Sequence, residues 1–365
     1  MKVVFCGTVV PEKIELKTPS ISAAGNRFQI NFIKGLQEAG HTVIQYSFLG
    51  MPLDKNICEE IQCYEENEKK FYFKKDGFIK SIRKYGKDIK QAMHKSDVVI
   101  CYNIIYAWLL LPVWANKKNS IVILADYTES ESYHSLYKKV YAHLQKWSMR
   151  KYKVVVGLSA NIEKKLKPRQ QFILMEGGIE KKFYDAFSYR EHKAEEPWIF
   201  MYSGLLSRVT GVDLLLNSML SLKRQDVKLI ITGKGDLEDE VREAAEKDKR
   251  IIYLGHLSYE EYMEQLQGAD ALINPRNMTL PENQNNFPSK IMDYLATGKV
   301  IISTKFVGWE KFKDNIFFLD STSEALTQRM EELEKIDNDT VYNKNRKKAM
   351  QFIWKEQIKR ILDKR

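Results

Sequence analysis

Residues suited to phosphate chemistry lie within one short stretch of the chain. Ser289 and Lys290 directly follow Pro288, and Asp293 comes three residues after Lys290. On a helix, Ser289 and Asp293 share a face, and Lys290 lies three residues from Asp293. The free N–H groups of a helix start, the positive end of the helix dipole and a lysine together favour a phosphate, and Asp293 is placed to accept from a ribose hydroxyl. A second interpretation stays open, in which Lys290 and Asp293 only pair in solvent at a capped helix end.

The neighbouring residues predict a helix that leads directly into a parallel strand. Proline is favoured in the first helical turn, so Pro288 marks the start of this helix, and Gly298 marks its end. The apolar, β-branched run from Val300 to Ser303 then predicts a strand. A helix followed so closely by a strand is half of a βαβ unit. Its start therefore lies at the edge of a parallel sheet, where such folds bind ligands.

The stretch from Phe287 to Ile302 resembles the donor-site signature of glycosyltransferase family 4, as found in bacterial capsule and exopolysaccharide transferases. The resemblance implies an α/β protein of the GT-B fold, in which two Rossmann-like domains with parallel sheets face each other across a cleft. It places Asp293 on the nucleotide ribose and Asn285, where the family usually has an acidic residue, at the sugar ring. The other residues of this donor-binding turn are Asn286, Phe287, Pro288 and Ser289.

Two glycine turns in the second half resemble other parts of the same donor site. After Gly204 the family usually has an arginine and a lysine that bind the diphosphate, whereas this chain has Leu205 and Thr210. Arg208 is the candidate for the missing charge, because a departing diphosphate needs more than one cation; an ordinary exposed loop residue is the alternative. Gly233 stands in a Gly-x-Gly turn that the family places near the nucleotide base, and the third glycine of a dinucleotide fingerprint is absent.

The first half offers two candidate residues, Gly25 and Asp126. Gly25 ends a polar loop rich in small residues, where a ligand can approach the backbone at a helix start, and a loop without function is the alternative. By resemblance, this loop closes over the cleft and touches donor or acceptor. Asp126 follows the apolar run Ile121 to Ala125, so its carboxylate is a candidate contact for a sugar hydroxyl, with a turn or cap residue as the alternative. Lys290, Arg208 and Asp126 are the predicted catalytic residues.

The order of strand-like and helix-like patterns predicts two domains. A chain of 365 residues is too long for one ordinary core. We expect an acceptor-side domain at 1–185, a nucleotide-sugar domain at 198–340 and a polar linker from Tyr184 to Pro197. The tail from Thr340 to Arg365 predicts one basic amphipathic helix, and by resemblance the segment 341–365 crosses back to the first domain.

The excess behind the formal charge of +10 is concentrated in the first half of the chain, where lysines are interleaved with an aromatic run from Lys69 to Lys75. Such a pattern suits an anionic membrane surface, although lysine-rich helices are often only a solvated face. No nucleic-acid motif is present, so nucleic acid is not an expected partner. The absence of a long apolar run and of a signal-peptide pattern predicts a cytoplasmic protein, peripheral on the inner face of the membrane.

The resemblance implies a retaining, metal-independent hexosyltransferase without a cofactor. Its donor is a nucleotide-diphosphate sugar, a UDP-sugar in preference to a GDP-sugar, and its acceptor is a hydroxyl of a lipid-linked saccharide in cell-surface polysaccharide synthesis. The four cysteines and six histidines show no metal-ligand spacing. The alternative is a non-catalytic saccharide- or nucleotide-binding subunit of a polysaccharide assembly complex, because the departures at Leu205, Thr210 and Asn285 are what loss of activity would leave.

Overall fold

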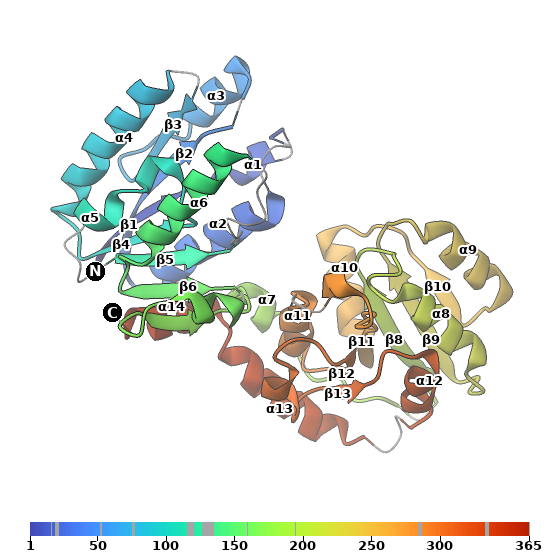
Figure 1. Cartoon of the computed structure of the whole chain (residues 1–365). Coiled ribbons are helices and arrows are strands. Elements are labelled where there is room, and N and C mark those ends of the chain that lie inside the picture. The colour runs from blue at the N-terminus through green and yellow to red at the C-terminus, as the bar shows by residue number, and fades with distance from the viewer. Residues whose placement is uncertain are drawn as a thin grey trace. The chain divides into compact units, whose positions relative to one another are not determined.

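The structure is a computed structural model that describes the whole chain except residues 16, 19–21, 52, 75–76, 115–119, 126–134, 159, 194, 284–286, 333–335 and 365. The described chain divides into two compact units (Figure 1). Unit 1 comprises Met1–Gly178 and Trp354–Arg365, and unit 2 comprises Ile179–Ile353. Each unit is a parallel sheet with helices on both faces, which confirms the predicted pair of Rossmann-like folds.

In the described part of unit 1, a seven-stranded parallel sheet has the order β3-β2-β1-β4-β5-β6-β7. Its central strands β1, β4 and β5 are buried along nearly their whole length, and they are mostly apolar because helices cover both of their faces. The strands are β1 (Lys2–Gly7), β2 (Thr42–Leu49), β3 (Lys69–Phe73), β4 (Val98–Tyr102), β5 (Ser120–Leu124), β6 (Val154–Gly157) and β7 (Gln171–Leu174).

The helices of unit 1 form two layers. One layer packs on one face of the sheet and contains α2 (Ala23–Glu38) and α14 (Trp354–Leu362). The opposite layer contains α4 (Phe78–Met93), the 3-10 turns η2 (Tyr106–Trp108) and η4 (Ala160–Lys165), α5 (Leu111–Trp114) and α6 (Leu136–Met149). The short helices α1 (Glu12–Glu15) and α3 (Lys55–Gln62) pack at the β3 edge.

Unit 2 repeats this plan on a six-stranded sheet, in the residues described, of order β10-β9-β8-β11-β12-β13. The strands are β8 (Trp198–Ser203), β9 (Val227–Thr232), β10 (Ile251–Tyr253), β11 (Ala271–Asn274), β12 (Val300–Thr304) and β13 (Phe317–Leu319). One face packs against α8 (Val212–Ser221), α9 (Glu238–Lys247) and α12 (Ser323–Glu331). The other face packs against α7 (Lys181–Asp185), α10 (Tyr259–Gly268), α11 (Lys290–Thr297) and α13 (Asn338–Met350). Two 3-10 turns lie in its loops, η5 (Pro281–Asn283) and η6 (Trp309–Phe312).

The strand order reverses once in each sheet, beside its first strand. The reversal lies between β1 and β4 in unit 1 and between β8 and β11 in unit 2. Loops that follow the two strands at such a point pass to opposite faces of the sheet and leave a crevice at the carboxyl edge. The carboxyl edge of unit 2 between β8 and β11 is therefore the place where the fold itself predicts a ligand.

The predicted unit of helix and parallel strand is confirmed by α11 and β12. Pro288 is buried just before α11, and its carbonyl oxygen accepts a hydrogen bond from the Ile291 N–H at 3.0 Å. Gly298 ends the helix with φ +76°, a left-handed conformation that glycine adopts without a steric penalty.

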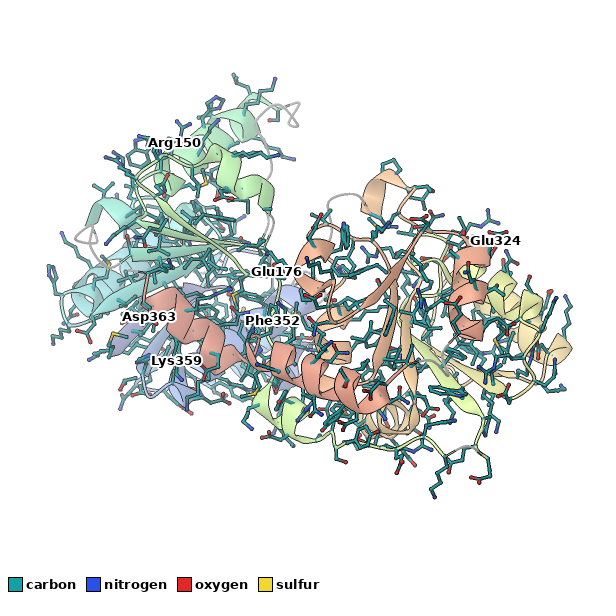
Figure 2. The ribbon with its side chains drawn as sticks, turned by 90° about the horizontal axis from the view of Figure 1, so that it is seen from below. Arg150, Glu176, Glu324, Phe352, Lys359 and Asp363 are labelled. Carbon is teal, nitrogen blue, oxygen red and sulfur yellow. The ribbon has the colours of Figure 1, made fainter. Side chains whose placement is uncertain are left out.

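The single helix predicted for the carboxyl-terminal tail is wrong. Two helices, α13 and α14, are separated by Gln351, Phe352 and Ile353, and Figure 2 shows Phe352 near the break with Lys359 and Asp363 further along the tail. The Ile179 N–H donates to the Phe352 carbonyl oxygen at 2.8 Å, and Ile179 forms a parallel β-bridge with Ile353. The backbone here turns and then pairs with a distant segment, which is incompatible with a continuous helix.

The predicted boundary after residue 185 and the predicted linker are corrected as well, because unit 2 already begins at Ile179. Within the expected linker, a guanidinium nitrogen of Arg190 donates to the Gly268 carbonyl oxygen at 2.8 Å, and the His192 ring stacks on Trp198 at 4.1 Å between centroids. The segment packs through these polar and stacking contacts and through the buried Phe187, which leaves no apolar period in the sequence. The structure groups Trp354–Arg365 with unit 1.

None of the described helices combines the length and the apolar character that crossing a bilayer requires.

The packing of α14 on α2 yields a stability prediction. The Trp354 ring meets Phe28 edge-on at 5.1 Å, and a Cβ added at Gly35 of α2 would lie 2.8 Å from the Trp354 Cβ. We expect Trp354→Ala to lower the free energy of unfolding of unit 1 by ~3–5 kcal/mol in urea denaturation, because a buried aromatic side chain is lost. Met350→Ala removes an exposed side chain from α13 and should change it by less than ~0.5 kcal/mol. Equal effects of the two substitutions would contradict a core role for α14.

Candidate active site

The candidate site lies where loops leave the carboxyl edge of the unit 2 sheet. The loop after β8 covers residues 204–211, and the loop after β11 begins at Pro275. The Val209 carbonyl oxygen accepts hydrogen bonds from the Asn283 side chain at 2.7 Å and from the Asn277 N–H at 3.3 Å. These contacts tie the two loops together across the point of strand reversal.

Lys290, in the first turn of α11, reaches across to the end of β8. Its Nζ donates to the Ser203 carbonyl oxygen at 2.8 Å and lies 4.1 Å from the centre of the Tyr202 ring. Burial, together with the positive charge of Arg276, lowers the pKa of Lys290 to about 7. The alternative ion pair with Asp293 is not formed between these two described residues, and no carboxylate elsewhere in the described chain pairs with Lys290. A desolvated ammonium group without a counter-ion favours an anion.

Arg276 is the second cation of the site, and the sequence analysis missed it. Its carbonyl oxygen accepts from the Thr304 hydroxyl at 2.7 Å, which fixes the backbone beside β12. Burial lowers the pKa of the Arg276 guanidinium, and its charge acts on Lys290 and on Tyr202. Among the residues described, no carboxylate pairs with Arg276. Arg276 could have been found from the sequence, because it closely follows an apolar parallel strand. The same criterion singled out Asp126.

Gly204 and Gly233 pack against each other at the ends of β8 and β9. The Gly204 N–H donates to the Thr232 carbonyl oxygen at 3.0 Å, and both glycines have positive φ, +139° and +131°. A Cβ on Gly233 would lie 1.8 Å from the Gly204 carbonyl oxygen, and a Cβ on Gly204 would lie 2.9 Å from Lys290 Nζ. Glycine is therefore required so that these backbones and the Lys290 ammonium group can meet. Donor binding by both glycines stays a prediction.

The loop after β8 is closed by Thr210, which stands where the family usually has a lysine. The Thr210 hydroxyl lies 2.6 Å from the Leu205 carbonyl oxygen, to which it donates, and accepts from the Ser207 N–H at 3.2 Å. Arg208, in the same loop, has an exposed side chain that makes no hydrogen bond or ion pair with a described residue. The structure thus places Arg276, rather than Arg208, beside Lys290.

A cavity of about 460 Å³ lies along the carboxyl ends of β8, β9 and β10. Burial and the negative charge of Asp293 raise the pKa of Tyr262 in its wall, so the partly buried Asp293 carboxylate lies close to this wall. The cavity and the Lys290 site share the backbone of Ser203 and Gly204. The lining residues are Ser203, Gly204, Leu205, Thr232, Gly233, Lys234, His256, Leu257, Ser258, Tyr259 and Tyr262.

Residues 185–351 match the family described as "Glycosyl transferases group 1". This segment contains the whole site described above. No curated protein matches the chain by sequence.

Solved glycosyltransferases share the fold of the entire chain. A glycosyltransferase from Rickettsia africae superposes with a TM-score of 0.67 at 18% identity, over 99% of this chain and 97% of its own. Anabaena HepE in complex with UDP gives 0.66 at 14% identity over all of both chains. The lipopolysaccharide outer core galactosyltransferase WaaB gives 0.61 at 15% identity, also over all of both chains. At these identities the likeness shows the fold alone, which is GT-B.

The remaining predicted residues of unit 2 have mixed environments. Phe287 packs edge-on against Phe306 at 5.2 Å, so its side chain belongs to the core behind α11. Ser289 is exposed and does not cap α11, which leaves its hydroxyl available to a ligand. Asn285 and Asn286 lie outside the described residues.

The two candidates of the first half belong to unit 1. The Gly25 N–H donates to the Ser22 hydroxyl at 3.2 Å, so this backbone donor is already used to cap α2. A Cβ on Gly25 would lie 3.1 Å from the Tyr102 hydroxyl, which explains the absence of a side chain. Asp126 lies outside the described residues. No group of three metal-ligating side chains gathers within the described ranges, and metal independence stays a prediction.

The lowered pKa of Lys290 predicts that UDP binding takes up a proton. The free ammonium group titrates near pH 7, and a bound diphosphate raises its pKa, so affinity falls as pH rises through the interval between the two values. We expect the Kd for UDP, measured by calorimetry, to rise by up to about tenfold per pH unit from pH ~7.5 upward. Repeating the titration in buffers of different ionisation enthalpy measures the proton uptake directly. Lys290→Arg keeps its charge throughout this range and should flatten the profile. A flat profile in the unsubstituted protein would contradict the role of Lys290.

Proposed function

We propose that the chain is a retaining glycosyltransferase that moves a hexose from a nucleotide-diphosphate sugar, a UDP-sugar in preference to a GDP-sugar, to an acceptor hydroxyl. The observation that carries the proposal is a pair of cations, Lys290 and Arg276, that form no ion pair with any carboxylate of the described residues. They lie at the strand reversal of the segment that matches the group 1 glycosyltransferase family. The adjoining cavity of about 460 Å³ has room for a nucleoside. UDP bound to Anabaena HepE, which has the same fold, supports the choice of nucleotide.

In the proposed reaction, the bond between the sugar C1 and the diphosphate oxygen breaks, and the diphosphate leaves with the electron pair. The acceptor oxygen bonds to C1 on the same face, and its proton passes to the departing phosphate oxygen. Lys290 and Arg276 stabilise the charge that accumulates on this oxygen, at fixed positions in a partly desolvated site. The chain then needs no separate general base.

The remaining roles concern orientation. Asp293 beside the cavity wall is positioned to accept from the ribose, and the exposed Ser289 hydroxyl at the start of α11 is available to a phosphate oxygen. Phe287, Pro288, Asn285 and Asn286 precede α11 as the proposed sugar-binding turn. Gly25 and Asp126 are proposed contacts of unit 1 with the transferred sugar or the acceptor.

The acceptor we propose is a lipid-linked saccharide of cell-surface polysaccharide synthesis, held at the inner face of the membrane. The fold of a lipopolysaccharide galactosyltransferase and the basic character of the first half support this choice. The departures from the family pattern at Leu205 and Thr210 favour the second candidate function, a binding subunit that holds a nucleotide or saccharide without turnover.

The test is substitution of the two cations in an assay of UDP-sugar hydrolysis and transfer. Lys290→Ala and Arg276→Ala should each lower kcat by roughly a hundredfold or more with a smaller effect on the affinity for the intact UDP-sugar, because both act on charge that grows in the transition state. Arg208→Ala is the matched control for an exposed arginine and should keep kcat within about threefold. Asp293→Ala should mainly raise KM, because a ribose contact is present before and during reaction alike.

The pattern of results separates the candidates. UDP binding that depends on Lys290, with no hydrolysis or transfer from any of a panel of nucleotide sugars, would support the binding subunit. Loss of activity in Arg208→Ala with full activity in Arg276→Ala would contradict the assignment of the second cation. If Lys290→Ala and Asp293→Ala lose only stability, α11 is an element of the fold rather than of the site.

A further inference from the structure

Large apolar side chains are exposed along one helical layer of unit 1. In the described part of this unit, every exposed large apolar side chain except Met1 lies on α4, α5 or α6, or is Leu110, just before α5. Their exposed fractions lie between 40% and 78%. They are Ile79, Leu110, Val113, Leu136, Val140, Leu144 and Trp147. Residues scattered singly over a surface need no explanation, but this set is confined to one layer.

The four side chains of α6 form a continuous stripe. Leu136, Val140, Leu144 and Trp147 recur at steps of four, four and three residues, so they lie on one side of the helix. The opposite side of α6 faces the core, where Met149 is fully buried. Its position is fixed by the Gln145 side chain, which donates to the Ile104 carbonyl oxygen at 2.6 Å. The stripe therefore points away from the sheet on a helix that is firmly attached to it.

The helical layer that carries the stripe also exposes cations that form no ion pair with a carboxylate of the described residues. α4, in the same layer, exposes Lys80, Arg83, Lys84, Lys87 and Lys90, and none of them forms an ion pair with a described residue. On α6 the exposed Lys139 and the partly buried Lys146 flank the apolar side chains, and α6 contains no acidic residue. The Lys151 ammonium group lies 5.5 Å from the centre of the Trp147 ring, and Arg150 follows the helix (Figure 2).

We propose that the outer face of this layer, here called the α4–α6 face, docks on an anionic lipid bilayer, with the α6 stripe inserted at the boundary between headgroups and acyl chains. An interfacial helix has one apolar face and a lysine-rich flank, and tryptophan is favoured at that depth. Lysine stems extend over apolar surface while their ammonium groups reach the phosphates. Nucleic acid would use the cations and leave the aliphatic stripe in water.

The α4–α6 face lies on unit 1, whereas the nucleotide site lies on unit 2, so this inference stands without the proposed glycosyl transfer. The membrane assigned to the acceptor above is consistent with it, but no residue is shared between the two sites. Failure of the docking test would leave the nucleotide site unaffected, and UDP binding serves as an independent readout of folding.

The experiment compares two double variants of the full chain in sedimentation with vesicles. Val140→Glu/Leu144→Glu adds two carboxylates to the α6 stripe, and Leu220→Glu/Val307→Glu makes the same change at exposed positions of unit 2. With vesicles of 70% phosphatidylcholine and 30% phosphatidylglycerol, we expect the first variant to bind at least tenfold more weakly than the unsubstituted chain and the second to stay within about twofold. Both should bind UDP unchanged.

The lipid charge and the cations of α4 supply the second comparison. Binding of the unsubstituted chain should weaken at least tenfold on pure phosphatidylcholine, and each of Lys80→Gln, Lys84→Gln and Lys87→Gln should weaken binding to anionic vesicles by up to about fivefold. Quenching of tryptophan fluorescence by brominated lipid should be reduced in Trp147→Phe. No binding to anionic vesicles, equal binding to neutral vesicles, or equal loss in the two double variants would overturn the proposal.

Discussion

The desolvated Lys290 ammonium group is the constraint on which the second unit depends. It is held by the Ser203 carbonyl oxygen and the Tyr202 ring and by no carboxylate among the described residues. This position requires that Gly204 carry no side chain, because a Cβ there would meet the ammonium group. Gly233 must also lack a side chain, because a Cβ there would collide with the Gly204 carbonyl oxygen. The ends of β8 and β9 are therefore shaped around a cation supplied by a helix far along the chain. A side chain at either glycine would displace the charge from the crevice.

A second positive charge increases the cost of this arrangement. Arg276 lowers the pKa of Lys290 further, and burial lowers the pKa of Arg276 as well, so the free site is electrostatically unfavourable. Natural proteins tolerate such a cost where binding relieves it. In the proposed reaction, the repulsion between the two cations is relieved progressively as negative charge accumulates on the leaving oxygen. The cations therefore stabilise the transition state more than the bound donor, which lowers the activation barrier.

The parts of this structure that could be predicted are those with local causes. Pro288 and Gly298 mark the ends of α11 through their own backbone preferences. The order of strand-like and helix-like patterns along the sequence predicts the two α/β units. Arg276 was missed because its neighbours are set by the pairing of β8 with β11, while the family pattern drew attention to Arg208. The break between α13 and α14 was missed for a related reason, since the pairing with Ile179 that causes it joins residues far apart in the sequence.

The buried Lys299 shows why it matters that no described carboxylate pairs with Lys290. Lys299 lies just beyond the other end of α11, and burial lowers its pKa to about 8 although the nearby Asp270 carboxylate opposes the shift. Its Nζ donates to the Gln267 carbonyl oxygen at 2.9 Å, and Asp270 in turn accepts from the Ile199 N–H at 2.8 Å. That network joins the start of β8 to its neighbours and satisfies its own charges, so it holds the sheet together. Burial also lowers the pKa of Lys290, which has a carbonyl partner too, but among the described residues a second cation and no carboxylate acts on it. This unbalanced charge marks its end of α11 as the place for an anion.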